Sequence, residues 1–150
     1  MNAVRRGAAV VQRYVVTLYF IGVIVQFFLV GYGLFGMKHG ATIDNAKSLD
    51  AHRGFGFILI EIIGGVLLIA TLVAWQRPLG RKGGLYVLLC LLGVVQATLA
   101  TEGFHHKWVG MFHPVNALIL LGLSGRLAFG AWREARGGEP AQEAVATSPT

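Results

Sequence analysis

Two histidines, His52 and His113, each stand at the start of a long apolar segment and are the residues best suited to chemistry. Each is followed four residues later by a small residue, Gly56 and Ala117 respectively. An imidazole at the end of a membrane helix, with a small residue one turn deeper on the same face, suits axial ligation of a flat porphyrin. Whether the two imidazoles can meet depends on the helices that carry them.

Four apolar segments of the 150-residue chain are candidates for these helices: 14–35, 54–75, 83–101 and 114–132. Two of them contain no charged residue, and the other two carry one each, Glu61 and Arg126. A helix needs about 20 apolar residues to cross a hydrocarbon layer of about 30 Å. With a mean hydropathy of +0.62, the chain is expected to be a multi-pass membrane protein.

The basic residues predict the orientation of the chain. With the amino terminus inside, the inner segments hold nine basic residues, which are Arg5, Arg6, Arg13, Arg77, Arg81, Lys82, Arg126, Arg133 and Arg136. The outer segments hold four, which are Lys38, Lys47, Arg53 and Lys107. An excess of Lys and Arg marks the cytoplasmic side. Both termini are therefore expected in the cytoplasm, with the chain in the plasma or inner membrane.

The net charge of +6 and the segments at the two chain ends are consistent with a membrane protein. Basic residues that flank spans suit anionic lipid headgroups, so the lipid bilayer is an expected partner and nucleic acid is not. We expect a basic cytoplasmic leader at 1–13, a membrane bundle at 14–132 and a disordered cytoplasmic tail at 133–150. Cys90 is the only cysteine, which excludes an intrachain disulfide.

Short connections between the spans predict an all-α, up-down-up-down four-helix transmembrane bundle. In this topology the second and fourth helices both begin at the outer face and lie diagonally across the core. His52 and His113 are then expected at the same depth in the membrane. The distance between the two diagonal helices is about the length of two imidazoles with an iron between them. A weak internal repeat agrees with this arrangement, because HRGFGFILI at 52–60 aligns without gaps with HPVNALILL at 113–121.

These features resemble one four-helix half of haem A synthase and, more loosely, cytochrome b561-type proteins. The segment HPVNAL at 113–118 also resembles a family of small four-helix membrane proteins of unassigned function. In the synthase halves a histidine on the second helix and one on the fourth hold haem, which by resemblance implies haem ligation by His52 and His113. The chain has one bundle rather than two and lacks a cysteine pair in the first outer loop.

Polar residues near this site suggest further roles. Arg53 and Lys107 stand at the outer interface and are candidates to pair with haem propionates, although Arg53 could equally reach the headgroups. Glu61 lies about 13 Å deeper than His52 and on roughly the opposite face. It is a candidate for a proton path or quinone pocket, or for a polar network with Gln26, Gln96 and Asn116.

The remaining histidines, His39, His105 and His106, also belong to the outer segments. His39 or His106 is an alternative axial ligand, and a divalent metal site at the surface is another interpretation. Their spacing fits no closed ligand motif.

The sequence thus predicts a membrane haem b protein that transfers single electrons near the outer face, with a quinone or a redox protein as partner. The alternatives are a haem carrier or sensor, and a non-redox accessory or scaffold subunit that binds a divalent metal. Glycines that face lipid would also allow a homodimer.

Overall fold

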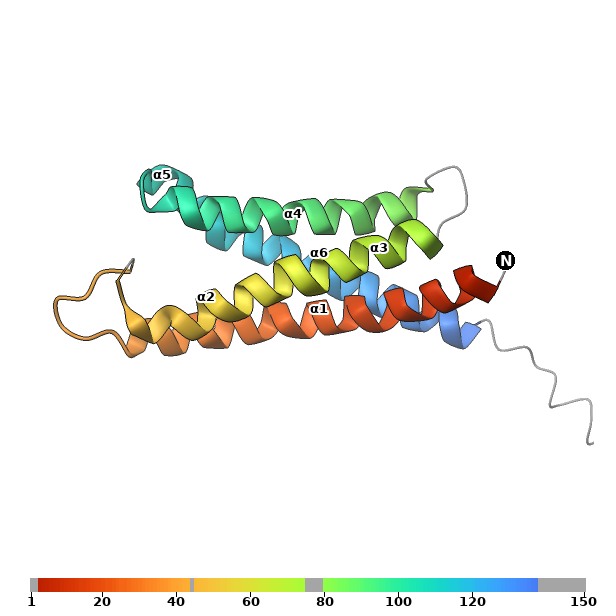
Figure 1. Cartoon of the computed structure of the whole chain (residues 1–150), viewed down its shortest axis with the longest axis horizontal. Coiled ribbons are helices and arrows are strands. Elements are labelled where there is room, and N and C mark those ends of the chain that lie inside the picture. Colours follow the sequence, from red (N-terminus) through yellow and green to blue (C-terminus); the bar gives the residue numbers. More distant parts are fainter. Residues whose placement is uncertain (1–2, 44, 75–79, 138–150) are drawn as a thin grey trace, which may run out of the picture.

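The computed structural model describes residues 3–43, 45–74 and 80–137, and within these ranges the chain is helical, with no strand. The first span is α1 (Ala3–Phe35), and the second consists of η1 (Lys47–Leu49), α2 (Asp50–Phe57), η2 (Ile58–Ile63) and α3 (Gly64–Ala74). The third span is α4 (Arg81–Gly103), and the fourth follows α5 (Lys107–Gly110) as α6 (Phe112–Gly137). Figure 1 shows these segments running antiparallel to one another along the chain.

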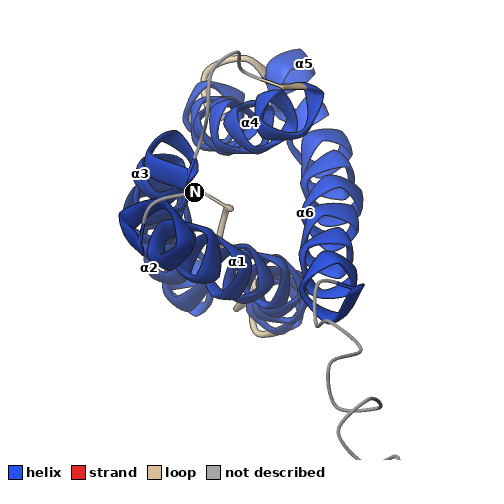
Figure 2. Ribbon diagram, turned by 90° about the vertical axis from the view of Figure 1, so that its right-hand side faces the viewer, coloured by secondary structure: helices blue, strands red, loops and turns tan. Residues whose placement is uncertain are grey.

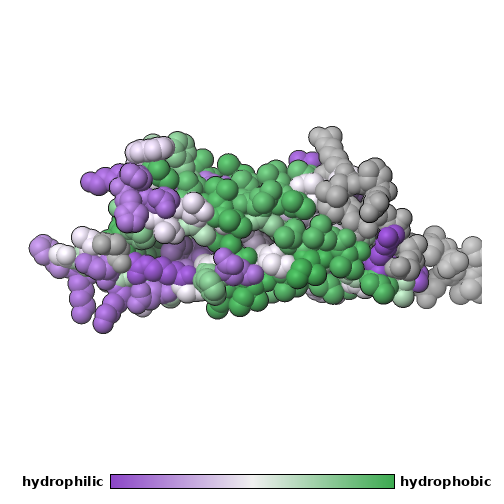
Figure 3. All heavy atoms as spheres, turned by 45° about the horizontal axis from the view of Figure 1, so that its top comes forward, coloured by the Kyte–Doolittle hydropathy of each residue, from purple (hydrophilic) through white to green (hydrophobic). Residues whose placement is uncertain are grey.

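Each of the four helical segments is long and apolar enough to cross a membrane. Large apolar side chains are exposed along all of them, among them Phe28, Ile69, Leu91 and Leu118. On the face that Figure 3 shows, apolar side chains cover most of the middle of the molecule, and polar side chains gather mainly toward its ends. The expected all-α, multi-pass membrane protein is therefore confirmed.

The helices form a four-membered ring of neighbours. The first helix, α1, packs against α3 and α6, and α4 packs against the same two helices from the other side. Figure 2, viewed along the bundle, shows α2 and α3 on the side opposite α6. The second and fourth spans therefore lie diagonally, as the sequence predicts.

The two ends of this bundle differ, and we name them by their residues. The histidine end comprises 36–43, 45–53 and 104–113, and the termini end comprises 3–13, 80–86 and 126–137. Because α1 begins and α6 ends at the same end, both described chain ends belong to the termini end (Figure 1).

A π-helical segment, η2, interrupts the second span. The residues buried on this span include Leu59 and Gly64, which are five positions apart, whereas an α-helix repeats a buried position every three or four residues. One extra residue is thus accommodated between α2, which carries His52, and α3. The apolar run ILIEII at 58–63 contains no periodicity that would reveal this insertion.

The chain ends are more helical than the sequence suggests. The leader is continuous with the first span, because α1 begins at Ala3. The expectation of disorder from residue 133 onward is wrong for 133–137, since α6 continues to Gly137. Glu134 on this extension pairs with Lys82 of α4, which connects the end of α6 to the start of α4. Residues 138–150 of the expected tail lie outside the described residues.

The core is built from α1, α3, α4 and α6, with Tyr19, Leu67 and Leu89 among the fully buried side chains. Glycine lets two of these helices approach closely, because a Cβ atom on Gly125 of α6 would lie 2.9 Å from the Phe20 ring of α1.

Candidate functional site

The rings of His52 and His113 meet at the histidine end of the bundle. Their centroids are 6.4 Å apart, and their planes cross at 77°. His52 lies in the first turn of α2, and His113 is the second residue of α6. Both side chains are partly buried. The structure therefore brings together the two histidines that the sequence singles out, from helices that are not neighbours.

The first loop fixes the start of α2. Ser48 of η1 donates a hydrogen bond from Oγ to the Gly33 carbonyl oxygen at 2.7 Å. A Cβ atom on Gly33 would lie 2.9 Å from the Ser48 carbonyl oxygen, so only glycine fits this approach without a backbone shift. The end of α1 thereby sets where the helix of His52 begins.

The third loop fixes the start of α6 in a comparable way. Gly103 at the end of α4 packs against Gly110 of α5, where a Cβ atom on Gly103 would lie 2.7 Å from the Gly110 Cα atom. This backbone contact folds α5 onto the end of α4. The chain then enters α6 at Phe112, one residue before His113.

The hydrogen bonds of His113 define its tautomer. Nδ1 lies 3.1 Å from the backbone carbonyl oxygen of Gln96, which can only accept a hydrogen bond. The proton of the neutral ring is therefore on Nδ1, and Nε2 carries the lone pair. Nε2 lies 3.1 Å from the Gln96 side-chain nitrogen, which can only donate. An Nδ1–H bonded to a carbonyl, with Nε2 unprotonated, is the form in which histidine binds metals.

Asn116 completes the polar contacts of His113. Its side-chain nitrogen donates to the Gln96 Oε1 atom at 2.8 Å and to the Leu92 carbonyl oxygen at 2.9 Å. The side chain is only 6% exposed, so both hydrogen bonds are shielded from the surroundings. Asn116 thus orients the Gln96 amide toward His113 and joins α6 to α4.

The other histidine has unused hydrogen-bonding capacity. The His52 backbone carbonyl accepts a hydrogen bond from Gln26 Nε2 of α1 at 3.1 Å. The His52 Nδ1 atom and the Gln26 Oε1 atom are both buried without a hydrogen-bond partner among the described residues. Buried polar atoms of this kind are uncommon in native proteins, and a bound water, ion or other group would satisfy them.

The small residues next to the histidines differ in what surrounds them. A Cβ atom on Gly56 would lie 2.5 Å from Gln26 Nε2, so the Gln26 amide fills the room that the sequence suggests for a porphyrin. Ala117 is partly buried one turn below His113. Glycine at position 56, one turn from His52, therefore allows the Gln26 side chain of α1 to lie close against α2.

The separation of the imidazoles can be compared with that of two axial ligands. A ring nitrogen binds a transition metal at about 2.0–2.1 Å, and the ring centroid lies about 1.1 Å behind it, so two ligands on opposite sides have centroids about 6.3 Å apart. The observed 6.4 Å agrees with this value. The two imidazoles thus have the separation of a bis-imidazole pair, but the Gln96 amide occupies Nε2 of His113 and the Gln26 amide lies beside Gly56, so both amides would have to move for a haem to bind.

The basic residues expected near propionates lie differently. Arg53 donates to Asp50 Oδ1 at 2.8 Å, to the Ala46 carbonyl oxygen at 3.2 Å and to the Ile43 carbonyl oxygen. Its guanidinium thus braces the first loop against α2. Lys107 begins α5 and is exposed at the same end of the bundle.

Glu61 lies apart from this polar cluster. It belongs to η2 and is exposed on the outer surface of the bundle, amid exposed apolar residues such as Ile58 and Ile62. The network that the sequence suggests is therefore present in part, with Gln96 and Asn116 joined through His113 and Gln26 bound to His52. Among the described residues, Glu61 makes no hydrogen bond or ion pair with this network.

The other histidines, His39, His105 and His106, are all exposed. Within the described ranges 3–43, 45–74 and 80–137, no group of three or more His, Cys, Asp or Glu side chains is placed to hold a metal ion. A divalent ion at the His52–His113 pair would thus need water or another molecule for the rest of its ligands.

The sequence gives little sign of the part played by Gln96. It is a polar residue in an otherwise apolar span, but the hydrogen bond from His113 goes to its backbone, which every residue has. Only the packing of α4 against α6 selects this carbonyl.

The chain matches no protein-family model, no curated protein and no solved structure.

Proposed function

We propose that this chain is a membrane b-type haem protein in which His52 and His113 are the axial ligands. The observation that carries the proposal is the meeting of two imidazoles from diagonal helices at a centroid distance of 6.4 Å. The Nδ1–H tautomer of His113 and the unpartnered Nδ1 atom of His52 support it. No charged side chain is needed in the core to hold such a group, because both ligands are neutral imidazoles.

Several residues around the two histidines would help to hold the haem. The Gln96 carbonyl fixes the ring of His113 through Nδ1 and keeps Nε2 available. Gln26 ties the backbone of His52 to α1, which limits the movement of the first turn of α2. The Gln96 amide caps Nε2 of His113 in the structure and must swing aside for ligation. Lys107 is one of the exposed basic side chains at this end, and its ammonium group would suit a carboxylate at the interface.

The proposed activity is transfer of single electrons. When bound, a haem with two imidazole ligands supplies an iron that changes between ferric and ferrous and offers no open axial position to oxygen. By the distribution of basic residues, the histidine end faces outward and the termini end faces the cytoplasm of a plasma or inner membrane. The partner would be a quinone in the bilayer or a redox protein outside it.

A second candidate is a non-redox scaffold subunit, and the Gln96 amide favours it. The contacts among Gln96, His113 and Asn116 satisfy one another, as polar side chains do when they join membrane helices. Haem content separates the two functions, because a scaffold needs none. A haem carrier or sensor would contain haem but exchange it with apomyoglobin, whereas an electron-transfer protein would retain it.

The visible spectrum of the detergent-purified protein, before and after dithionite, tests the proposal. We expect a Soret band that shifts and sharpens on reduction to a low-spin form. His52→Ala and His113→Ala should each lose the haem or become high-spin. His105→Ala is the matched control, because this histidine is exposed at the same end, and its spectrum should be that of the unaltered chain. A colourless, monodisperse protein made with ample haem would favour the scaffold.

A further inference from the structure

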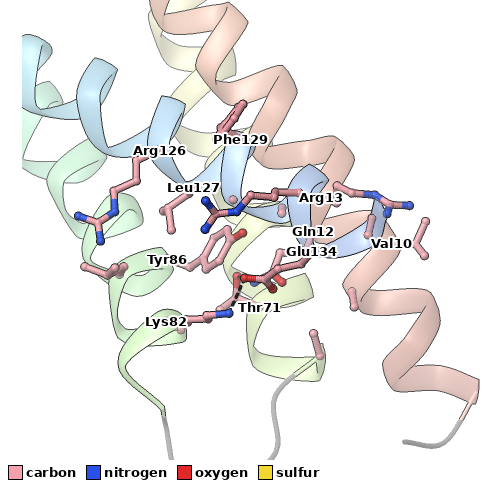
Figure 4. A pocket seen from close by; sticks show the side chains of 18 residues that line it. Val10, Gln12, Arg13, Thr71, Lys82, Tyr86, Arg126, Leu127, Phe129 and Glu134 are labelled. Carbon is pink, nitrogen blue, oxygen red and sulfur yellow. Dashed lines mark hydrogen bonds and ion pairs between the residues drawn. The ribbon is translucent and has the colours of Figure 1, made fainter. Parts of the chain in front are cut away.

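A separate cavity lies at the termini end of the bundle. Its volume is about 660 Å³, and its walls come from α1, α3, α4 and α6. Figure 4 shows side chains of all four helices converging on it, with Arg13 from α1 and Tyr86 from α4 directed into the space between them. The cavity is therefore remote from His52 and His113, which lie at the histidine end.

The charge of the cavity is mainly positive. Its lining contains one acidic side chain, Glu134, and four basic side chains, which are Arg13, Lys82, Arg126 and Arg133. Lys82 and Glu134 pair with each other, as the dashed line in Figure 4 shows. The lining thus keeps three arginines in excess of its internal ion pair, and this excess favours an anion.

Arg13 is held in place by aromatic rings rather than by a carboxylate. The Cζ atom of its guanidinium lies 4.7 Å from the Trp132 ring centroid and 5.5 Å from that of Tyr14. Among the described residues it makes no ion pair, and its Nε atom is buried without a hydrogen-bond partner. Contact with the two aromatic rings restricts the guanidinium, while no carboxylate among the described residues pairs with it.

Polar and apolar surfaces meet in this cavity. Gln12 donates from Nε2 to the Thr71 hydroxyl at 2.8 Å on one wall. Val10 and Phe129 also line the cavity and are exposed on the outside of the bundle, Phe129 by 66%. A lipid whose anionic headgroup lies in the cavity and whose acyl chains lie along Val10 and Phe129 would match both surfaces.

We propose that this cavity binds a phosphate-bearing anion, either the headgroup of an anionic lipid or a free phosphate group. Arginine donates in a planar fork that matches phosphate oxygens, and basic pockets between membrane helices bind lipid headgroups in the same way. Arg13 is the central contact, and Arg126 and Arg133 add charge at the rim. The Lys82–Glu134 pair closes one side and keeps the carboxylate neutralised.

Titration of the delipidated full chain in detergent tests this site. The probes are phosphatidylglycerol, phosphatidylcholine and inorganic phosphate, each followed by the shift in unfolding temperature and by native mass spectrometry. We expect phosphatidylglycerol to bind at least about tenfold more tightly than phosphatidylcholine. If inorganic phosphate alone raises the unfolding temperature as strongly, free phosphate is the ligand. If only phosphatidylglycerol does so, the ligand is the lipid headgroup.

The matched variants are Arg13→Gln and Arg6→Gln, which remove the same charge from the same helix. Arg6 is exposed and does not line the cavity. Arg13→Gln should weaken binding about tenfold or more, and Arg6→Gln should leave it nearly unchanged. Arg126→Gln combined with Arg133→Gln, at exposed positions, provides the test if Arg13→Gln does not fold. Equal affinity for both lipids without a phosphate effect, or equal losses in Arg13→Gln and Arg6→Gln, would overturn the proposal.

Discussion

The ring of His113 donates from Nδ1 to the backbone carbonyl of Gln96, while its Nε2 atom accepts from the side chain of the same residue. One residue of α4 thus both positions the imidazole and caps the nitrogen that a metal would bind. The two contacts can be separated by mutation, because only one of them involves the side chain. This separation distinguishes a haem site from a structural hydrogen-bond network.

Gln96→Leu is expected to keep or increase haem binding. The substitution removes the amide from Nε2 of His113 but leaves the backbone carbonyl that holds Nδ1. The haem-to-protein ratio of the purified variant, relative to that of the unaltered chain, measures the effect. Loss of haem in Gln96→Leu, with the fold intact by circular dichroism, would contradict the assigned role of the amide.

Gly33→Ala is expected to destabilise the chain by about 1–3 kcal/mol, because the new methyl group would press on the Ser48 carbonyl oxygen 2.9 Å away. Thermal unfolding in detergent measures this loss. Gly31→Ala is the control on the same helix, because nothing lies within 4 Å of the added atom. Equal unfolding temperatures for the two variants would mean that the first loop does not pack on α1 as described.

Trp132→Phe is expected to lower stability by about 1 kcal/mol. The indole Nε1–H donates to the Thr17 hydroxyl at 2.9 Å, and the ring stacks on the Arg13 guanidinium. Phenylalanine keeps an aromatic ring but loses the donor. Trp108→Phe, at an exposed position of α5, is the control and should unfold at the same temperature as the unaltered chain. A larger loss at position 108 than at 132 would contradict the packing of α6 against α1.

Glu61→Leu is expected to leave haem content unchanged and to stabilise the chain in a bilayer. The carboxyl group faces outward in the middle of a span, where contact with hydrocarbon is costly, and it lies apart from the histidine cluster. The haem ratio and the unfolding temperature in nanodiscs measure the two effects. A loss of haem in Glu61→Leu would instead place this residue in the site.

Much of the fold can be predicted from the sequence, because four charge-poor segments and short links leave few arrangements in a bilayer. The diagonal placement of His52 and His113 follows from that topology alone. The π-helical turn at 58–63 does not, since every position there except Glu61 is apolar and gives no periodic signal. The helical residues 133–137 escape prediction as well, because the ion pair of Glu134 with Lys82 depends on packing between α4 and α6.

The site is less predictable than the fold, because its details depend on which groups the packing brings together. The role of Arg53 is an example. Its position near His52 suggests a partner for carboxylates of a ligand, whereas the folded loop brings the Ala46 and Ile43 carbonyls and the Asp50 carboxylate to it. Gln26 likewise fills the space beside Gly56, and no local pattern on α2 indicates a side chain from α1.

Electron paramagnetic resonance of the oxidised, detergent-purified protein tests the central claim most directly. Ligation of the iron by two imidazoles predicts a low-spin ferric signal. His52→Ala and His113→Ala should each abolish that signal or convert it to high spin. Absence of any ferric haem signal in protein made with ample haem, or a low-spin signal that survives both substitutions, would contradict ligation by this pair.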